Sequence, residues 1–196
     1  MTEPLRLFLA GPAGSGKTEV ARLLEEQHHF CRVSLGDLCR AEATRRGWPD
    51  DRLHLQAAGD ALRGADAARL ADLALGQVRG LRGPVVVEGV RLAAEAGHLR
   101  ARGVIGVAVE APEHVRQARL LGRDGSGWVP AHRTEREAEN LPVDLRLANG
   151  GDREALEKAV RLVVARAALL QAERRSILHR APPVRTPRRE FAGMER

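Results

Sequence analysis

Short apolar runs alternate with segments of helical periodicity over most of the chain. Continuous apolar runs bounded by turn residues are typical of strands buried on both faces of a parallel sheet. We expect five such strands, at residues 5–10, 30–35, 84–88, 104–109 and 144–149. Helical patterns lie between and after them, at residues 19–26, 36–46, 52–63, 66–80, 92–102, 112–121 and 152–173. The alternation predicts an α/β fold in which helices cover both faces of a five-stranded parallel sheet, with ligands at the carboxyl ends of the strands.

A glycine-rich turn follows the first expected strand. Residues 11–18 read Gly-Pro-Ala-Gly-Ser-Gly-Lys-Thr, which is the P-loop pattern G-x-x-x-x-G-K-T, and a helical pattern follows at once. In such a loop the backbone N–H groups converge on nucleotide phosphates, the lysine reaches the β- and γ-oxygens, and the threonine hydroxyl is a ligand of Mg²⁺. The pattern therefore predicts a three-layer α/β/α P-loop NTPase fold that binds ATP and Mg²⁺. The residues expected to bind ATP are Gly11, Ala13, Gly14, Ser15, Gly16, Lys17 and Thr18, and Thr18 is also expected to contact the metal ion.

The composition strengthens the interpretation of Lys17. The chain has 32 basic residues, yet only Lys17 and Lys158 are lysines. An ammonium group on a thin stem fits between phosphates where a planar guanidinium does not. A lysine at position 17 in so arginine-rich a chain indicates a chemical requirement, and we expect Lys17 to be catalytic.

The net charge of +6 is concentrated near the end of the sequence, since residues 172–196 hold seven arginines and three glutamates. At 196 residues the chain is long enough for one core, so we expect one domain over residues 1–173 and a basic tail rich in proline and arginine over 174–196. Aromatic residues do not interleave with the tail's arginines, which favours a solvated tail over a nucleic-acid-binding one.

No stretch of the sequence reaches the length of a membrane span, and the N-terminus lacks a signal-peptide pattern, so we expect a cytoplasmic protein with no membrane partner. Cys31 and Cys39 are too few for a disulfide framework, and their grouping with His28 and His29 lacks the close C-x-x-C pairing of structural zinc sites. We interpret both cysteines as small buried hydrophobic side chains.

Polar motifs follow the second and third expected strands. Residues 34–40 read Ser-Leu-Gly-Asp-Leu-Cys-Arg, and residues 88–91 read Glu-Gly-Val-Arg. Together with the P-loop, these motifs resemble those of nucleoside monophosphate kinases over roughly residues 5–165. The resemblance implies that Arg40 and Arg91 hold the phosphate of the acceptor, that Asp37 orients the acceptor, and that Glu88 stands near the Mg²⁺ shell. This chain has Glu88 and Val90 where that family commonly has aspartate and proline.

A second stretch with the spacing G-D-x-x-R lies in the segment 47–65, where such kinases place their acceptor-binding helices. Residues 56–63 read Gln-Ala-Ala-Gly-Asp-Ala-Leu-Arg and resemble the corresponding stretch of deoxynucleoside monophosphate kinases. The resemblance implies that Arg63 is a further contact of the acceptor. A chain rich in glycine, alanine, aspartate and arginine also produces this spelling by composition alone, so a structural role for Arg63 stays open.

Two further expectations concern a lid over the site and the adenine of ATP. Residues 119–135 correspond to a lid, whose arginines Arg119 and Arg123 would close over the transferring phosphoryl group. Residues 144–151 resemble the closing strand and turn of dephospho-CoA kinases and related enzymes, which implies that Asn149 helps to frame the adenine of ATP, although a turn asparagine needs no such role. The catalytic set expected from the sequence is thus Lys17, Asp37, Arg91, Arg119 and Arg123.

These features predict phosphoryl transfer from ATP to a nucleoside or deoxynucleoside monophosphate, a small-molecule acceptor. A dephospho-CoA kinase is the nearest alternative, with Asp37 as the base that takes a proton from a ribose hydroxyl. That family usually has the spacing D-x-x-x-R, whereas Asp37 and Arg40 are spaced as D-x-x-R. A P-loop ATPase or regulator, or a nucleotide-binding protein without catalysis, is the alternative from another class. Such ATPases generally carry Asp-Glu after an apolar strand, and Glu88 followed by glycine fits that pattern poorly.

Overall fold

The five predicted strands form one parallel sheet in the computed structural model, which describes residues 4–124 and 140–180. The order across the sheet is β2-β3-β1-β4-β5, and every neighbouring pair is parallel. The strands are β1 (Arg6–Ala10), β2 (Cys31–Ser34), β3 (Val85–Glu88), β4 (Ile105–Glu110) and β5 (Leu145–Ala148). The predicted α/β/α P-loop fold is confirmed, and its sheet has β1, the strand that leads into the P-loop, at the centre.

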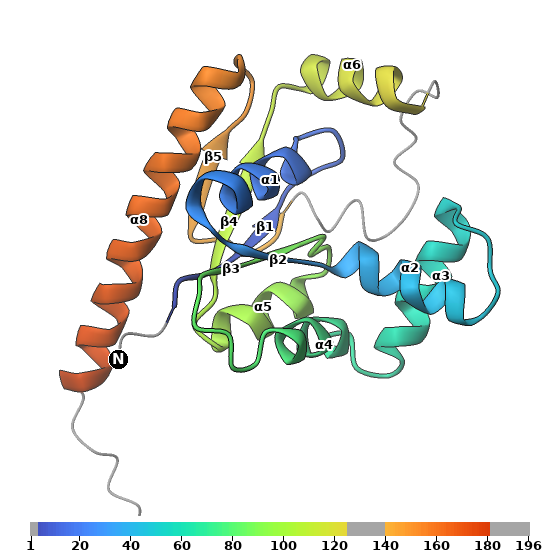
Figure 1. Cartoon of the computed structure of the whole chain (residues 1–196), viewed down its shortest axis with the longest axis horizontal. Coiled ribbons are helices and arrows are strands. Elements are labelled where there is room, and N and C mark those ends of the chain that lie inside the picture. Colours follow the sequence, from blue (N-terminus) through green and yellow to red (C-terminus); the bar gives the residue numbers. More distant parts are fainter. Residues whose placement is uncertain (1–3, 125–139, 181–196) are drawn as a thin grey trace, which may run out of the picture.

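Successive apolar side chains of β1 point to opposite faces of the sheet, and helices cover both of these faces (Figure 1). Leu7 and Leu9 point into one core, and Phe8 and Ala10 point into the other. The first core is closed by helices α1 (Lys17–His28) and α8 (Arg153–Arg180), and the second by α4 (Arg69–Gln77) and α5 (Ala93–Ala101). A strand buried on both faces needs apolar side chains at successive positions, which is the pattern that the sequence shows.

Two helices project from the carboxyl edge of β2 as an arm of the molecule (Figure 1). They are α2 (Leu35–Arg45) and α3 (Arg52–Arg63), which pack on each other. The hydroxyl of Ser34 caps α2 by accepting a hydrogen bond from the amide of Asp37, and the carboxylate of Asp51 caps α3 by accepting one from the amide of His54. Helix α6 (Glu113–Asp124) stands on the other side, after β4.

Helix α8 differs from the prediction in length. The sequence pattern predicted a helix over 152–173, whereas α8 continues to Arg180 and so includes residues that were assigned to the basic tail. No proline interrupts the chain until Pro182, and a helix pays no steric penalty before that point. Residues 181–196 lie outside the described part of the chain, as do 125–139, which hold most of the predicted lid.

Asp144 joins three elements at the end of the sheet opposite the P-loop. Its carboxylate accepts hydrogen bonds from Arg100 of α5 at 2.9 Å, from the amide of Gly106 in β4 at 2.8 Å, and from Arg174 of α8 at 2.5 Å. Burial raises the pKa of Asp144, but these three hydrogen bonds outweigh burial and hold the pKa below its ordinary value. This ionised carboxylate therefore ties the C-terminal helix to the sheet.

The two cysteines differ in burial. The expectation of two buried cysteines was wrong for Cys31, which is exposed because it begins the edge strand β2, while Cys39 is partly buried on α2.

Among the helices that the structure describes, none has a stretch both long enough and apolar enough to pass through a membrane.

Candidate active site

The P-loop connects β1 to α1 at the carboxyl edge of the sheet. Helix α1 begins at Lys17, and its N-cap is Gly16, which has no side chain that caps the first turn. The N–H groups of that turn thus remain available to an anion, where the helix dipole also favours negative charge. The ammonium of Lys17 donates hydrogen bonds to the carbonyls of Gly11 at 2.7 Å and Pro12 at 2.8 Å, so it lies folded along the loop.

Two glycines of the loop are held where no other residue fits. Gly14 has φ of 75°, and a Cβ there would lie 2.6 Å from the backbone oxygen of Arg116 on α6. Gly16 has φ of 92°, and a Cβ there would lie 2.2 Å from the side-chain nitrogen of Asn149, just after β5. Gly14 and Gly16 therefore allow close approaches to the loop from α6 and from the β5–α8 turn.

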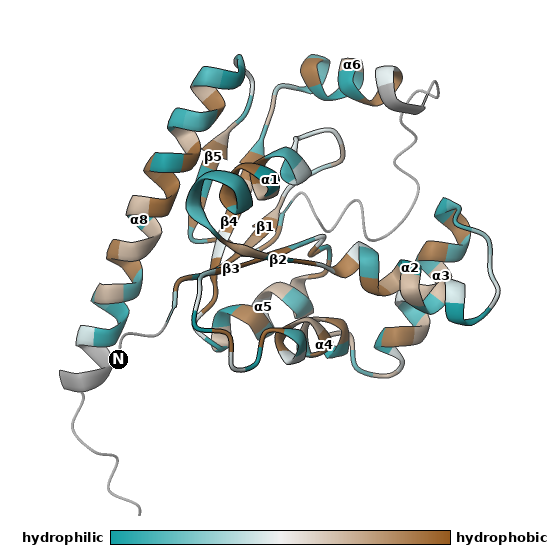
Figure 2. Cartoon of the chain, viewed as in Figure 1, coloured by the Kyte–Doolittle hydropathy of each residue, from teal (hydrophilic) through white to brown (hydrophobic). Residues whose placement is uncertain are grey.

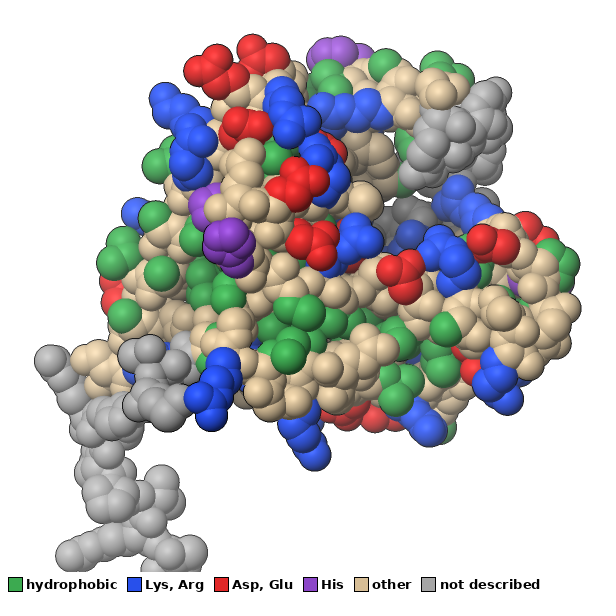
Figure 3. All heavy atoms as spheres, viewed as in Figure 1, with side chains coloured by type: hydrophobic (Ala, Val, Ile, Leu, Met, Phe, Trp, Pro, Cys, Tyr) green, Lys and Arg blue, Asp and Glu red, His purple; other side chains and the backbone are tan. Residues whose placement is uncertain are grey.

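One cavity of about 930 Å³ runs from the P-loop to the α2–α3 arm. In Figure 3, blue Lys and Arg side chains lie on both sides of the hollow between α6 and this arm. The predicted site residues that line the cavity come from five separate segments of the chain. They are Gly11, Ala13, Gly14, Gly16, Lys17, Thr18, Asp37, Arg40, Arg63, Glu88, Arg91 and Arg119.

Arg40 lines the cavity from the exposed side of α2. Its guanidinium contacts the carboxylate of Asp37 at 2.5 Å and that of Asp50 at 3.4 Å. Side chains of these three residues are each about half exposed or more, so the ion pairs are open to exchange with an incoming anion. Arg40 can therefore bind a phosphate only in competition with the carboxylates of Asp37 and Asp50.

Arg63 is held quite differently, because it is buried. Its Nε donates to Oε1 of Glu95 at 2.9 Å, and the Arg63 side chain is 10% exposed and that of Glu95 0%. The second oxygen of Glu95 accepts hydrogen bonds from the amides of Arg91 at 3.0 Å and Leu92 at 3.1 Å. One buried carboxylate thus joins the end of α3 to the turn that carries Arg91. Cys39 lies beside this pair, and burial raises the pKa of its thiol.

Glu88 and Thr18 offer the oxygen atoms that Mg²⁺ prefers. Both line the cavity, and the carboxylate of Glu88 is nearly buried at the end of β3. Arg32 of β2 lies 3.5 Å from that carboxylate. In the described residues no three His, Cys, Asp or Glu side chains gather as a metal cluster. The residues therefore fit a Mg²⁺ ion that arrives with the phosphates of a nucleotide rather than a metal held by protein alone, with Arg32 as a competing cation.

Arg119 bridges the P-loop and the turn after β5. Its guanidinium donates to the backbone oxygen of Gly14 at 3.3 Å and to that of Asn149 at 3.2 Å. The side chain of Asn149 is buried and donates from Nδ2 to the backbone oxygen of Ser15 at 2.8 Å. These contacts place Arg119 and Asn149 against the P-loop.

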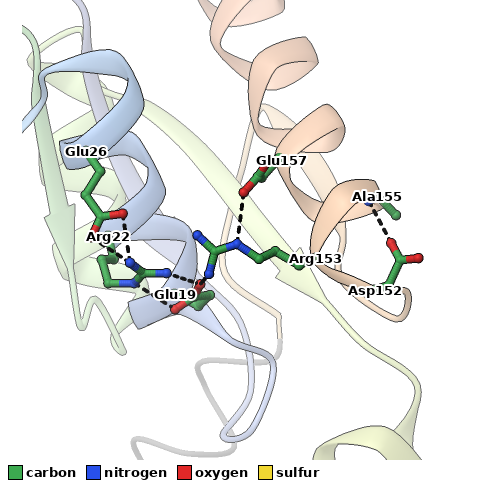
Figure 4. Close-up of polar contacts among 7 residues, drawn as sticks. All are labelled: Glu19, Arg22, Glu26, Asp152, Arg153, Ala155 and Glu157. Atoms are coloured by element: carbon green, nitrogen blue, oxygen red, sulfur yellow. Dashed lines mark hydrogen bonds and ion pairs between the residues drawn. The ribbon is translucent and has the colours of Figure 1, made fainter.

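A second cavity, of about 290 Å³, opens beside Arg119 and Asn149. Figure 4 shows the contacts along its rim, where the guanidinium of Arg153 lies 3.0 Å from Glu157 and 3.7 Å from Glu19. The hydrogen bond from Arg22 to Glu19 lowers the pKa of that carboxyl. The rim thus links the start of α1 to the start of α8, and Leu156 supplies an apolar wall next to the phosphate-binding loop.

Most predicted site residues are therefore close together, with three exceptions. Ser15 is a P-loop residue that is fully buried and does not line the large cavity. Asn149 lines the smaller cavity instead. Arg123 lies on α6, but its side chain is outside the described part of the structure, as are residues 125–135 of the predicted lid.

Sequence reasoning missed four residues of the site. Arg32 had a signal, because it interrupts an apolar strand, and Arg52 lies within the predicted acceptor segment. Glu95 had none, since a glutamate in the first turn of a helix is common and its partner Arg63 is far away in sequence. Leu55 lines the cavity, but in the sequence it has the pattern of an ordinary core position.

Comparison with known proteins places the chain among ATP-binding folds. The sequence model described as the AAA domain matches residues 7–142, which is more than half of the chain. No curated protein is significantly similar in sequence.

Solved structures resemble it over most of its length. A protein from Thermus thermophilus has a TM-score of 0.57 and 22% identity, covering 84% of this chain and 98% of its own. A gluconokinase from Sinorhizobium meliloti has a TM-score of 0.53 and 19% identity, covering 88% and 99%. A shikimate kinase from Aquifex aeolicus has a TM-score of 0.56 and 14% identity, covering 84% and 99%. At these identities the likeness is one of fold.

Proposed function

The chain belongs to the AAA domain family, and from that premise we propose that it is an ATP-dependent kinase whose acceptor is a nucleoside or deoxynucleoside monophosphate. One observation carries the proposal. A single cavity of about 930 Å³ is lined both by the P-loop and by three arginines from other segments, Arg40, Arg63 and Arg91. Such a cavity has room for a donor and an acceptor, each with a phosphate-binding group of its own.

The donor end is the P-loop. ATP would place its phosphates against the N–H groups of Gly14 to Thr18, with Lys17 leaving its carbonyl partners to reach the β- and γ-oxygens. Thr18 and Glu88 would hold Mg²⁺, which neutralises charge on the phosphates when bound. The small cavity beside Arg119 and Asn149 is where we expect the adenine.

The acceptor end is built for an anion with an apolar neighbour. Arg40 and Arg91 supply guanidinium forks that can each bind a phosphate by two hydrogen bonds. Leu35, Leu55 and Leu70 also line the cavity and would offer a surface for a flat base. Phosphoryl transfer needs alignment and positive charge more than covalent help, so an anionic acceptor phosphate requires no base from the protein.

A hydroxyl acceptor is the competing reading. Gluconokinase and shikimate kinase are named for acceptors of that kind and have this fold, and Asp37 lies in the cavity where a base is needed. In this chain, however, the Asp37 carboxylate is already hydrogen-bonded to Arg40, so taking a proton would weaken an ion pair within the site. We therefore favour the monophosphate.

An assay of ADP release tests the proposal. The acceptors are the common ribo- and deoxyribonucleoside monophosphates, with dephospho-CoA, gluconate and shikimate beside them. We expect turnover with at least one monophosphate, and a deoxynucleotide first, given the resemblance of residues 56–63 to deoxynucleoside monophosphate kinases. Nucleosides without a phosphate should be poor acceptors, because the arginines would lose their partner.

Two variants make the assay specific. Arg40→Ala and Arg91→Ala should each lower kcat/KM for the monophosphate strongly while leaving KM for ATP within a few-fold of its original value. Arg46→Ala is the matched control, since Arg46 follows the same helix but pairs with Glu42 outside the cavity. Turnover of dephospho-CoA, gluconate or shikimate alone, abolished by Asp37→Asn, would overturn the monophosphate assignment.

A further inference from the structure

Helix α8 is apolar on two faces. One face, which includes Val160, Val163 and Ala167, is buried against the sheet and α1. On the other, Leu162 and Leu169 are 63% and 62% exposed. Figures 1 and 2 show α8 at the outer edge of the molecule, with hydrophobic segments along its length and no described element on its far side. A helix that is apolar on both sides is normally covered on both sides.

The exposed apolar positions follow a heptad. Leu162, Ala165, Leu169 and Ala172 are all exposed and recur at alternating spacings of three and four residues. These are the a and d positions of a coiled-coil seam, with leucine at each a and alanine at each d. The buried positions at 160, 163 and 167 fall on the opposite side of the same helix. The second face is therefore a narrow seam suited to another helix.

Charged side chains beside the seam favour a second copy of the same helix as the partner. Arg166 and Glu173 are one heptad apart, both exposed, and both at the e position. Neither forms an ion pair with another residue that the structure describes. Two antiparallel copies of a helix bring e positions of one copy against e positions of the other. Arg166 of each copy would then lie near Glu173 of the other, so that the pairing forms twice about a two-fold axis.

The opposite orientation is unfavourable. In a parallel pair, each e position faces a g position of the partner helix. Arg161, at g, would then face Arg166 of the other copy, and two such contacts of like charge would form. Size complementarity also favours the antiparallel arrangement, because an axis between Leu169 and Ala172 packs Leu169 of each copy against Ala172 of the other.

We propose that the exposed face of α8 binds a second copy of this chain, as an antiparallel helix pair centred between Leu169 and Ala172. The site described above lies at the carboxyl edge of the sheet, away from this face, so each protomer keeps its own cavity. The seam has only about two heptads. The dimer should therefore be reversible, with dissociation on dilution.

Molar mass measured by light scattering and sedimentation over about 1–200 μM tests the proposal, a range that brackets the weak affinity expected of a small interface. The protomer mass is 21.3 kDa, and the full chain should move from that mass toward twice that mass with concentration. Leu169→Glu should remain monomeric throughout. The control is Leu73→Glu, which changes a leucine of α4 that is 38% exposed, and it should associate as the original protein does.

Charge reversal tests the orientation. Arg166→Glu and Glu173→Arg should each weaken association by about tenfold, because two attractive pairs become two repulsive ones. Combining both reversals should restore the dissociation constant to within a few-fold. A parallel pair would instead tighten with Arg166→Glu, which removes its contact with Arg161, and that result would overturn the proposal.

Two other results would also overturn it. One is a mass of 21.3 kDa at every concentration, and the other is association that Leu169→Glu leaves unchanged. A variant that ends at Arg180 tests whether residues 181–196 of the same chain, rather than a second copy, cover the seam. If those residues cover the seam, their removal should start or strengthen association, whereas the proposal expects the dissociation constant to stay within a few-fold.

Discussion

Replacing Glu95 by glutamine should destabilise the protein more than any other neutralisation of a single carboxylate in the site. Glu95 is fully buried and uses both oxygens, one for the guanidinium of Arg63 and the other for the amides of Arg91 and Leu92. Glutamine has the same shape but one oxygen and one NH₂ group. Whichever way it turns, its NH₂ faces either Arg63 or the two amides, which are all donors.

The magnitude follows from burial. Breaking one partner of a buried ion pair costs about 3–5 kcal/mol, because the remaining charge keeps its desolvation penalty. Glutamine retains half of the hydrogen bonds, so we expect the lower end, about 3 kcal/mol. For a urea slope of about 2 kcal/mol per molar, the unfolding midpoint should fall by about 1.5 M with the slope unchanged.

Glu110→Gln provides the comparison. Glu110 also pairs with an arginine, Arg146, but both side chains are largely exposed. Exposed pairs contribute about 0–1 kcal/mol, so this variant should shift the midpoint by at most about 0.5 M. Equal shifts for Glu95→Gln and Glu110→Gln would refute the reasoning from burial.

A double-mutant cycle isolates the pair. Arg63→Met and Glu95→Gln each remove one partner, and the double variant removes both. We expect a coupling energy of about 1–3 kcal/mol between them, since each single variant strands the other charge. A coupling within about 0.5 kcal/mol of zero would mean that Arg63 and Glu95 do not act as a unit.

Three further predictions concern the P-loop and the opposite end of the sheet. Lys17→Ala should abolish turnover while circular dichroism and the urea midpoint stay unchanged, and comparable activity in the purified variant would refute a catalytic role. Gly14→Ala should abolish ATP binding measured by calorimetry, because its Cβ would lie 2.6 Å from a backbone oxygen, whereas Gly122→Ala, with nothing within 4 Å, should bind normally. For Asp144, a folded pKa below the ordinary value means that its stabilisation is present above about pH 4 and lost as pH falls through the folded pKa. Urea titrations should therefore show the original protein more stable than Asp144→Asn at pH 7 and the difference shrinking below pH 4, and a difference independent of pH would contradict this.

The elements that the sequence predicted well are those with a strong local pattern. The strand at Arg6–Ala10 is apolar on successive positions because both its faces are buried, and the P-loop pattern names its own geometry. Functional residues were expected just after β2 and β3 because parallel strands end at a common edge, and Arg40 and Arg91 line the same cavity as the P-loop. In each case the information lies within a few neighbouring residues.

What the sequence did not predict depends on contacts between distant segments. The link from Glu95 to Arg63 spans α5 and α3, and neither residue is unusual in its own helix. The contact of Asn149 with Ser15 depends on how the turn after β5 meets the P-loop, which the turn pattern alone leaves open. Likewise, the charged end of α8 resembles a solvated tail by composition, although it continues as helix to Arg180.

Transfer of a labelled γ-phosphoryl group tests the central claim most directly. ATP carrying a radiolabel in its γ-phosphate is incubated with Mg²⁺, the protein and each nucleoside monophosphate in turn, and the products are separated by chromatography. If ATP and the monophosphate occupy the two ends of the cavity between Lys17 and Arg40, the label should appear in a nucleoside diphosphate. Label found only in inorganic phosphate, at a rate that no acceptor changes, would contradict the account and indicate an ATPase.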